Sequence, residues 1–283
     1  MKTVFFRQRW FQLLVGGVIL FLLLEQAVIM TQNPNLTPTV ILLGAFVVPV
    51  AFVAYFYEHV RDRDISLPLL TTCFFIGGII GLGAAGVLEY ATLRSLSLAS
   101  LFGVALIEES VKLIFPLGMY LAWRYRHEAD GLLFGVSAGM GFAALETMGY
   151  GMVALIQSQG NVGTLQQVLL FRGLVSPAGH AAWTGLVCAV LWRERERAKR
   201  PTLNLKVASA FVLAVLLHAV WDIVSSLETQ SFVLLLVFLA GLGAVTAISL
   251  TLVVRRYLEA RKTLGDPALR PQDCSPTGQP DTK

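Results

Sequence analysis

The sequence is dominated by long apolar runs separated by short polar segments. A transmembrane helix needs about 20 predominantly apolar residues. Runs of about this length occur at residues 10–30, 36–57, 67–88, 98–123, 131–156, 169–192, 205–225 and 232–257. The pattern therefore predicts an all-α membrane protein with about eight transmembrane helices.

The basic residues indicate how these helices are oriented. If successive runs cross the membrane in alternating directions, 19 of the 22 Lys and Arg fall on one side. Arg94 and Arg172 fall in loops on the other side, and Lys112 lies inside a run. By the positive-inside rule, both termini are predicted to be cytoplasmic. The first run is too long for a signal-peptide core and has no small-residue cleavage site after it, so we expect an uncleaved first span.

Composition excludes several other classes of protein. The 283 residues are 55% hydrophobic and only 14% charged, whereas soluble domains carry about 25% charged residues. An ordinary soluble enzyme, a disordered protein and a nucleic-acid binder are therefore excluded. We expect a polytopic membrane domain over residues 1–263. The Pro-rich polar segment 264–283 is predicted to be a disordered cytoplasmic tail.

Ionisable residues lie near the middle of four consecutive predicted spans. A charged group at the centre of a membrane helix costs roughly 2.5–3.5 kcal/mol. Such groups must therefore pair, lose their charge, bind a metal or face water. We expect them to form one polar site between spans four and seven. The candidate site residues are Glu108, Glu109 and Lys112 in the fourth run, Glu146 in the fifth, His180 in the sixth, and His218 and Asp222 in the seventh.

Helical spacing predicts how some of these groups contact one another. Lys112 follows Glu108 and Glu109 by four and three residues, so its side chain is expected to project between the two carboxylates. It would neutralise one of them and leave the other for proton transfer. Asp222 follows His218 by four residues, which favours a contact that orients the His218 ring.

Two prolines lie beside this polar set. Pro177 precedes His180, and Pro116 follows Lys112. A proline inside a helix cannot donate to the carbonyl four residues earlier, so both helices are predicted to kink, freeing the carbonyls of Gly173 and Lys112. Such backbone suits a cavity that contains water.

A stripe of small residues precedes Glu146 in the fifth run. Gly131, Gly135 and Gly139 recur every four residues, a spacing that lets two membrane helices approach closely. We interpret this stripe as a packing surface only.

The polar motifs together resemble a known family. In order they read Glu108-Glu109-x-x-Lys112, Phe142-x-x-x-Glu146, His180-x-x-x-x-Gly185 and Leu217-His218-x-x-Trp221-Asp222. This series is similar to the PrsW-type intramembrane proteases, distant relatives of the CAAX-processing protease and bacteriocin-immunity membrane family. The resemblance covers about residues 97–225, which we take as the catalytic part. Family members often carry Asn where this chain has Thr147.

The resemblance implies cleavage of peptide bonds in or near the membrane. A type member of the family releases a sigma factor by cutting its anti-sigma partner. The partners implied here are a single-span membrane-protein substrate and the lipid bilayer. With no organelle signal, we expect a multi-pass protein of a bacterial plasma membrane.

Two mechanisms fit these residue types. In both, Glu108 or Glu109 is the general base that activates water. In the first, Glu146, His180 and His218 bind a zinc ion and leave its fourth position for water. In the second no metal takes part, and the two histidines stabilise the oxyanion of a glutamate-dependent reaction.

Two functions of other classes use the same residues. Intramembrane Glu, His, Asp and Lys also form the proton relays of secondary transporters, so a proton-coupled transporter is the alternative. In a third interpretation, the acids of a non-catalytic scaffold only hold helices together. The chain contains no HExxH, GxSxG, P-loop or CxxC motif, which removes the common signatures of zinc, serine, nucleotide and thiol-redox sites.

Overall fold

The computed structural model describes residues 5–60, 65–93, 98–227 and 231–265. Within these ranges the chain is helical and contains no β-strand. The α-helices are α1 (Arg9–Thr31), α2 (Thr37–Val60), α3 (Leu67–Thr92), α4 (Leu98–Lys112), α5 (Ile114–Leu121), α6 (Glu128–Gln157), α7 (Val162–Val175), α8 (His180–Ala198), α9 (Leu205–Ser225) and α10 (Phe232–Gly265). Short 3₁₀ helices are η1 (Phe5–Arg7), η2 (Pro34–Leu36) and η3 (Ser176–Ala178). The predicted all-α, multi-span class is confirmed.

Seven segments of the described chain are long and apolar enough to cross a membrane. They correspond to seven of the eight predicted runs. The fourth run, 98–123, was expected to be one span. It is instead divided at Leu113 into α4 and α5, each too short to span alone. Pro116 has no N–H to donate to the Lys112 carbonyl, which is the physical reason for a break at this point.

The sixth run is also divided, at the proline predicted to kink it. α7 ends at Val175, η3 contains Pro177, and α8 begins at His180. The carbonyl of Gly173 accepts a hydrogen bond from the Ser176 hydroxyl at 3.1 Å. α7 and α8 together form one apolar segment of 37 residues. The break places His180 at a helix N-terminus instead of the middle of a continuous helix.

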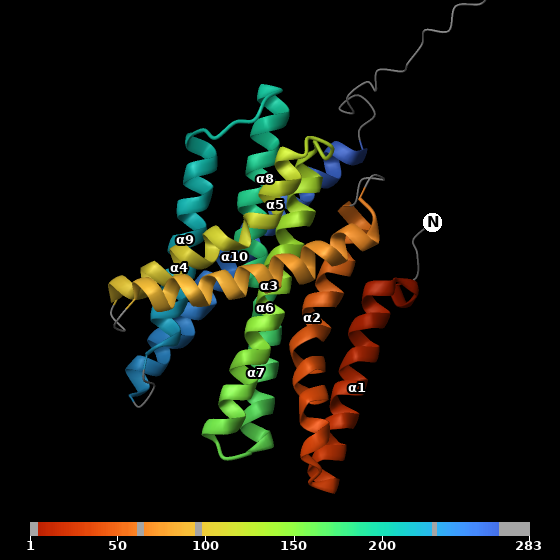
Figure 1. Ribbon diagram of the computed structural model, residues 1–283, viewed down its shortest axis with the longest axis vertical. Coiled ribbons are helices and arrows are strands. Elements are labelled where there is room, and N and C mark those ends of the chain that lie inside the picture. Colours follow the sequence, from red (N-terminus) through yellow and green to blue (C-terminus); the bar gives the residue numbers. More distant parts are fainter. Residues whose placement is uncertain (1–4, 61–64, 94–97, 228–230, 266–283) are drawn as a thin grey trace, which may run out of the picture.

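Helices α6 and α8 form the centre of the bundle (Figure 1). α1 and α2 lie to one side, α9 and α10 lie to the other, and α3 crosses the bundle obliquely next to α4. The first turn of α1 and the last turns of α10 lie toward the same end of the bundle. Cytoplasmic placement of both termini stays a prediction, and residues 266–283 of the predicted tail lie outside the described residues.

The contact between α6 and α8 depends on the predicted stripe of small residues. A Cβ atom on Gly135 would lie 2.6 Å from the Thr184 carbonyl oxygen, and one on Gly131 would lie 2.7 Å from that of Cys188. Gly139 approaches the His180 backbone just as closely. The packing interpretation of this stripe is confirmed, and the interface fixes the height of α8 against α6.

Candidate functional site

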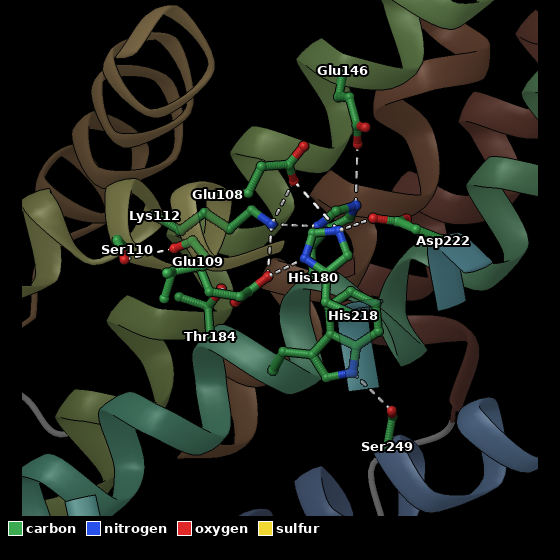
Figure 2. A network of polar contacts seen from close by, with 12 residues as sticks. Glu108, Glu109, Ser110, Lys112, Glu146, His180, Thr184, His218, Asp222 and Ser249 are labelled. Atoms are coloured by element: carbon green, nitrogen blue, oxygen red, sulfur yellow. Dashed lines mark hydrogen bonds and ion pairs between the residues drawn. The ribbon is translucent and has the colours of Figure 1, made fainter. Parts of the chain in front are cut away.

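The Glu-Glu-x-x-Lys motif lies in the last turns of α4, where its three charged side chains contact one another (Figure 2). Lys112 Nζ lies 3.0 Å from Glu108 Oε2 and 2.8 Å from Glu109 Oε1. The lysine is only 1% exposed, so its charge is compensated by protein groups. The predicted position of Lys112 between the carboxylates is confirmed. Lys112 contacts both carboxylates but carries one charge, so its neutralising only one of them stays a prediction.

His180 connects this motif to α6. Its Nδ1 lies 2.7 Å from Lys112 Nζ, and its Nε2 lies 3.1 Å from Glu146 Oε2. An ammonium group offers donors only, so Nδ1 accepts from Lys112 and Nε2–H donates to Glu146. The break before α8 makes this possible, because it turns the first residue of that helix toward both α4 and α6 (Figure 2).

His218 on α9 contacts the same motif from another side. Its Nδ1 lies 2.9 Å from Glu109 Oε1, and its Nε2 lies 3.5 Å from Asp222 Oδ2 and 3.6 Å from Glu108 Oε2. With Nδ1–H donating to Glu109, the Nε2 lone pair faces Glu108 and Asp222. The predicted contact with Asp222 exists, but Glu109 makes the shorter one. The Trp183 ring stacks on His218 with centroids 4.7 Å apart.

Glu146 forms an ion pair with Arg172, which the sequence pattern predicted to lie in a loop outside the membrane core. Arg172 lies in α7, with Nη2 2.6 Å from Glu146 Oε2 and Nε donating to Thr147 Oγ1 at 3.2 Å. Its guanidinium lies 3.9 Å from the Tyr150 ring centroid. Glu146 therefore bridges Arg172 and His180, and the hydroxyl of Thr147 serves as an acceptor beside it.

A cavity of about 560 Å³ lies between α3, α4, α6, α7, α8 and α9. Its lining includes Glu108, Glu146, His180, His218 and Asp222. It continues to Ser225 and Ser226 at the end of α9, and both are exposed. The predicted polar residues thus come together in one cavity that reaches the protein surface. Glu109 and Lys112 are buried beside it.

The cavity also contains a carboxyl group that the motifs did not indicate. Glu89, near the end of α3, lines the cavity, and its Oε1 is buried with no hydrogen-bond partner in the described part of the chain. A place near the end of an apolar run is typical of residues at the membrane surface, so spacing alone does not distinguish Glu89. Only the crossing of α3 over the bundle brings it to the site.

Glu108, His180 and His218 each offer one ligand atom, and these atoms lie within 4.8 Å of one another. One carboxylate with two imidazoles is a ligand set of catalytic zinc sites. The set predicted from the sequence had Glu146 in place of Glu108. In the structure Glu146 contacts Nε2 of His180 and Glu109 contacts Nδ1 of His218, so each ring is oriented by a carboxylate, as metal-binding histidines usually are.

Charge also suits a bound cation. Glu89, Glu108, Glu109, Glu146 and Asp222 face only two permanently basic groups in this cluster. These are Lys112 and Arg172. With neutral histidines and ionised acids the cluster carries three net negative charges, and such an excess inside a membrane needs protons or a metal ion to balance it.

Comparison with known proteins gives a family match. The family model described as PrsW family intramembrane metalloprotease matches residues 66–245, which include α3 and every helix of the cavity. No curated protein and no solved structure matches the chain. The matched region carries the Glu-Glu-x-x-Lys motif, both cavity histidines and Glu146. This chain belongs to the PrsW family of intramembrane metalloproteases, and it is therefore a multi-pass membrane peptidase.

Proposed function

We propose that this peptidase hydrolyses its membrane-protein substrates in the cavity between α4, α6, α8 and α9, with Glu108, His180 and His218 at the reactive centre. The observation that carries the proposal is the approach of these three side chains to within 4.8 Å inside a cavity that reaches the surface. The family match favours this function over the proton-coupled transporter and the scaffold.

The donor set fits a divalent metal such as zinc. Glu108, His180 and His218 would hold it, and it would polarise the scissile carbonyl and activate a water molecule. His218 offers Nε2 for this purpose and His180 offers Nδ1. Lys112 Nζ lies 2.7 Å from that Nδ1, so the ammonium and a metal would compete for one lone pair.

The other side chains have positioning and proton-transfer roles in this proposal. Glu109 holds the His218 ring, and Glu146, itself held by Arg172, holds the His180 ring. Asp222 lines the cavity 3.5 Å from His218 Nε2. As the attacking water oxygen bonds to the carbonyl carbon, Asp222 takes its proton. The proton then passes to the amine nitrogen when the C–N bond breaks.

A metal-free reaction uses the same residues differently. Glu108 would take the proton from water, and His218, in its protonated form, would donate from Nε2–H to the oxyanion. The contact between Lys112 and His180 supports this alternative, because it keeps His180 in place without an ion. Metal analysis of the purified wild type separates the two mechanisms. Active protein without a bound metal, unaffected by a chelator, contradicts the metal-dependent one.

The size of the cavity indicates the class of substrate. About 560 Å³ accommodates a short extended peptide segment and not a folded domain. A single-span protein whose helix unwinds near the membrane surface fits this limit. An anti-sigma-type regulator is one such protein, suggested by the family resemblance.

The experiment compares the termini of membrane proteins, by mass spectrometry, in cells carrying wild type, Glu108→Gln or Ser110→Ala at matched expression. Ser110 lies on the same helix but is exposed, with its hydroxyl bonded to the Leu106 carbonyl, so it serves as the control. We expect one or a few single-span proteins to be cut with wild type and Ser110→Ala only. Identical termini in all three would contradict the proposal.

A further inference from the structure

A second cavity, separate from the catalytic one, lies between α1, α2 and α3. Its volume is about 900 Å³. It lies where the start of α1, the end of α2 and the start of α3 meet at one end of the bundle (Figure 1). None of the catalytic candidates lines it, so the peptidase reaction leaves it unexplained.

The two ends of this cavity differ in chemistry. Arg7, Gln8, Arg9 and His59 line the end at the helix termini. The rest of the wall is mainly apolar and includes Leu13, Val50, Val53, Leu70, Phe74 and Phe75. The basic, polar end (the mouth) and the apolar remainder (the trough) together complement an amphipathic ligand that carries negative charge at one end.

The depth of the apolar part matches one leaflet of a bilayer. Along α2, the helix rises about 13 Å from Val50 to His59. One leaflet contributes about 15 Å of hydrocarbon. Trp10 and Tyr55 lie beside the mouth, with ring centroids 5.3 Å apart. Trp and Tyr gather at the membrane interface, which places the mouth at the level of the lipid headgroups.

The basic groups at the mouth are available to a ligand. Within the described ranges, neither Arg7 nor Arg9 forms an ion pair with a carboxylate, and both are exposed. Glu58 also lines the cavity, which leaves one net positive charge in the lining. Two guanidinium groups that line the same cavity suit a phosphodiester, because each can donate two hydrogen bonds to phosphate oxygens.

We propose that the cavity between α1, α2 and α3 is a binding site for one anionic phospholipid. Its phosphate lies between Arg7 and Arg9, and an acyl chain follows the apolar wall toward Val50 and Phe75. The bound lipid fills the space between α1 and α3, and α3 is the helix that carries Glu89 into the catalytic cavity. This site is independent of the peptidase mechanism.

The test measures lipids retained by the purified full-length protein, by native mass spectrometry, during titration with phosphatidylglycerol or phosphatidylcholine. We expect wild type to prefer phosphatidylglycerol. The double variant Arg7→Gln, Arg9→Gln is expected to lose roughly 10- to 30-fold of that affinity, since each basic residue contributes about fivefold near an anionic lipid. Glu58→Gln is expected to raise the affinity.

The matched control removes two positive charges elsewhere. Lys199 and Arg200 are exposed in the connection between α8 and α9, so Lys199→Gln, Arg200→Gln should keep the preference for phosphatidylglycerol. Thr71→Trp, which places a large ring in the trough, should abolish it without changing the helical circular-dichroism spectrum.

Three results would overturn the proposal. One is equal retention of the two lipids by wild type, and another is an unchanged preference in the Arg7, Arg9 double variant. The third is that Thr71→Trp blocks substrate cleavage while leaving lipid binding intact. That result would make the cavity between α1, α2 and α3 a substrate site. None of these three results depends on the activity of Glu108 variants. Failure of the lipid proposal and failure of the proposed function are therefore distinguishable.

Discussion

The two halves of α6 have opposite surroundings. Along Gly131, Gly135 and Gly139, which we call the dry half, the backbones of α6 and α8 are in direct contact. There is no room for a side chain between them. Beyond Gly139 α8 has ended, so the second half of α6 faces η3 and α7, and this wet half borders the space that contains Glu146, His180 and the cavity. The dry half holds α8 against α6, and the wet half carries polar groups of the cavity.

This contrast explains how one helix, α6, supports both stability and chemistry. Close backbone contact stabilises membrane helices where no hydrophobic effect acts between them. Polar groups and broken backbone are tolerated only where they line a cavity or find partners. The following experiments disturb one half at a time, in order of decreasing expected effect.

The largest effect is expected at the wet half. Glu108→Gln removes a charged group of the reactive centre and should lower the cleavage rate by at least about 10³-fold. The metal-dependent mechanism further predicts that the variant loses bound metal, measured by elemental analysis of purified protein. Ser110→Ala should match wild type in both measurements, and a Glu108→Gln protein with near-normal turnover would exclude Glu108 from the chemistry.

Glu109→Gln tests positioning instead of direct participation. The amide still reaches His218 but no longer carries the charge that Lys112 and His218 contact at 2.8 and 2.9 Å. For the metal-dependent mechanism we expect metal affinity to fall about 10- to 100-fold, the usual effect of losing such a partner. Competition with a chelator measures it. Unchanged affinity together with lost activity would instead make Glu109 a catalytic group.

Gly135→Val disturbs the dry half. Its Cβ would lie 2.6 Å from the Thr184 carbonyl oxygen, so α6 and α8 must separate, at a cost of about 1–3 kcal/mol in the free energy of unfolding. Thermal unfolding in detergent measures the loss. Gly149→Val is the control, because Gly149 lies on the same helix and an added Cβ atom there would meet nothing within 4 Å. Equal stability of the two variants would contradict the packing role.

Arg172→Gln acts at the edge of the wet half. It removes the 2.6 Å ion pair with Glu146 but leaves the contact between Glu146 and His180. We expect a loss of activity of about tenfold, smaller than for Glu108→Gln, because Arg172 acts through two other side chains. Steady-state cleavage of a purified substrate is the measurement, and Arg172→Lys should restore part of the rate.

The smallest effect is expected at Thr147. Thr147→Asn introduces the residue that family members often carry there, and its amide oxygen can accept from Arg172 Nε as the hydroxyl does at 3.2 Å. We expect the cleavage rate to change by less than about threefold. A gain of tenfold or more would show that an amide at this position contacts the substrate.

Local sequence patterns were enough to predict a multi-span membrane protein, most of its spans and the order of its polar motifs. These features depend on local properties, namely the length of apolar runs and the placement of charges within them. The short-range geometry of Lys112 also followed, because residues three and four apart share a helix face. The extent of the catalytic part, set at residues 97–225, stays a prediction.

Which of these groups contact one another depends on how the helices pack. The choice of Glu108 over Glu146 beside the two histidines, the contact of Glu109 with His218, and the arrival of Glu89 and Arg172 depend on how separate helices cross. Hydropathy fixes the depth of a residue in the membrane but not the rotation or tilt of its helix, which packing against neighbours sets. Residues at one depth on different helices therefore become partners only once the bundle has formed.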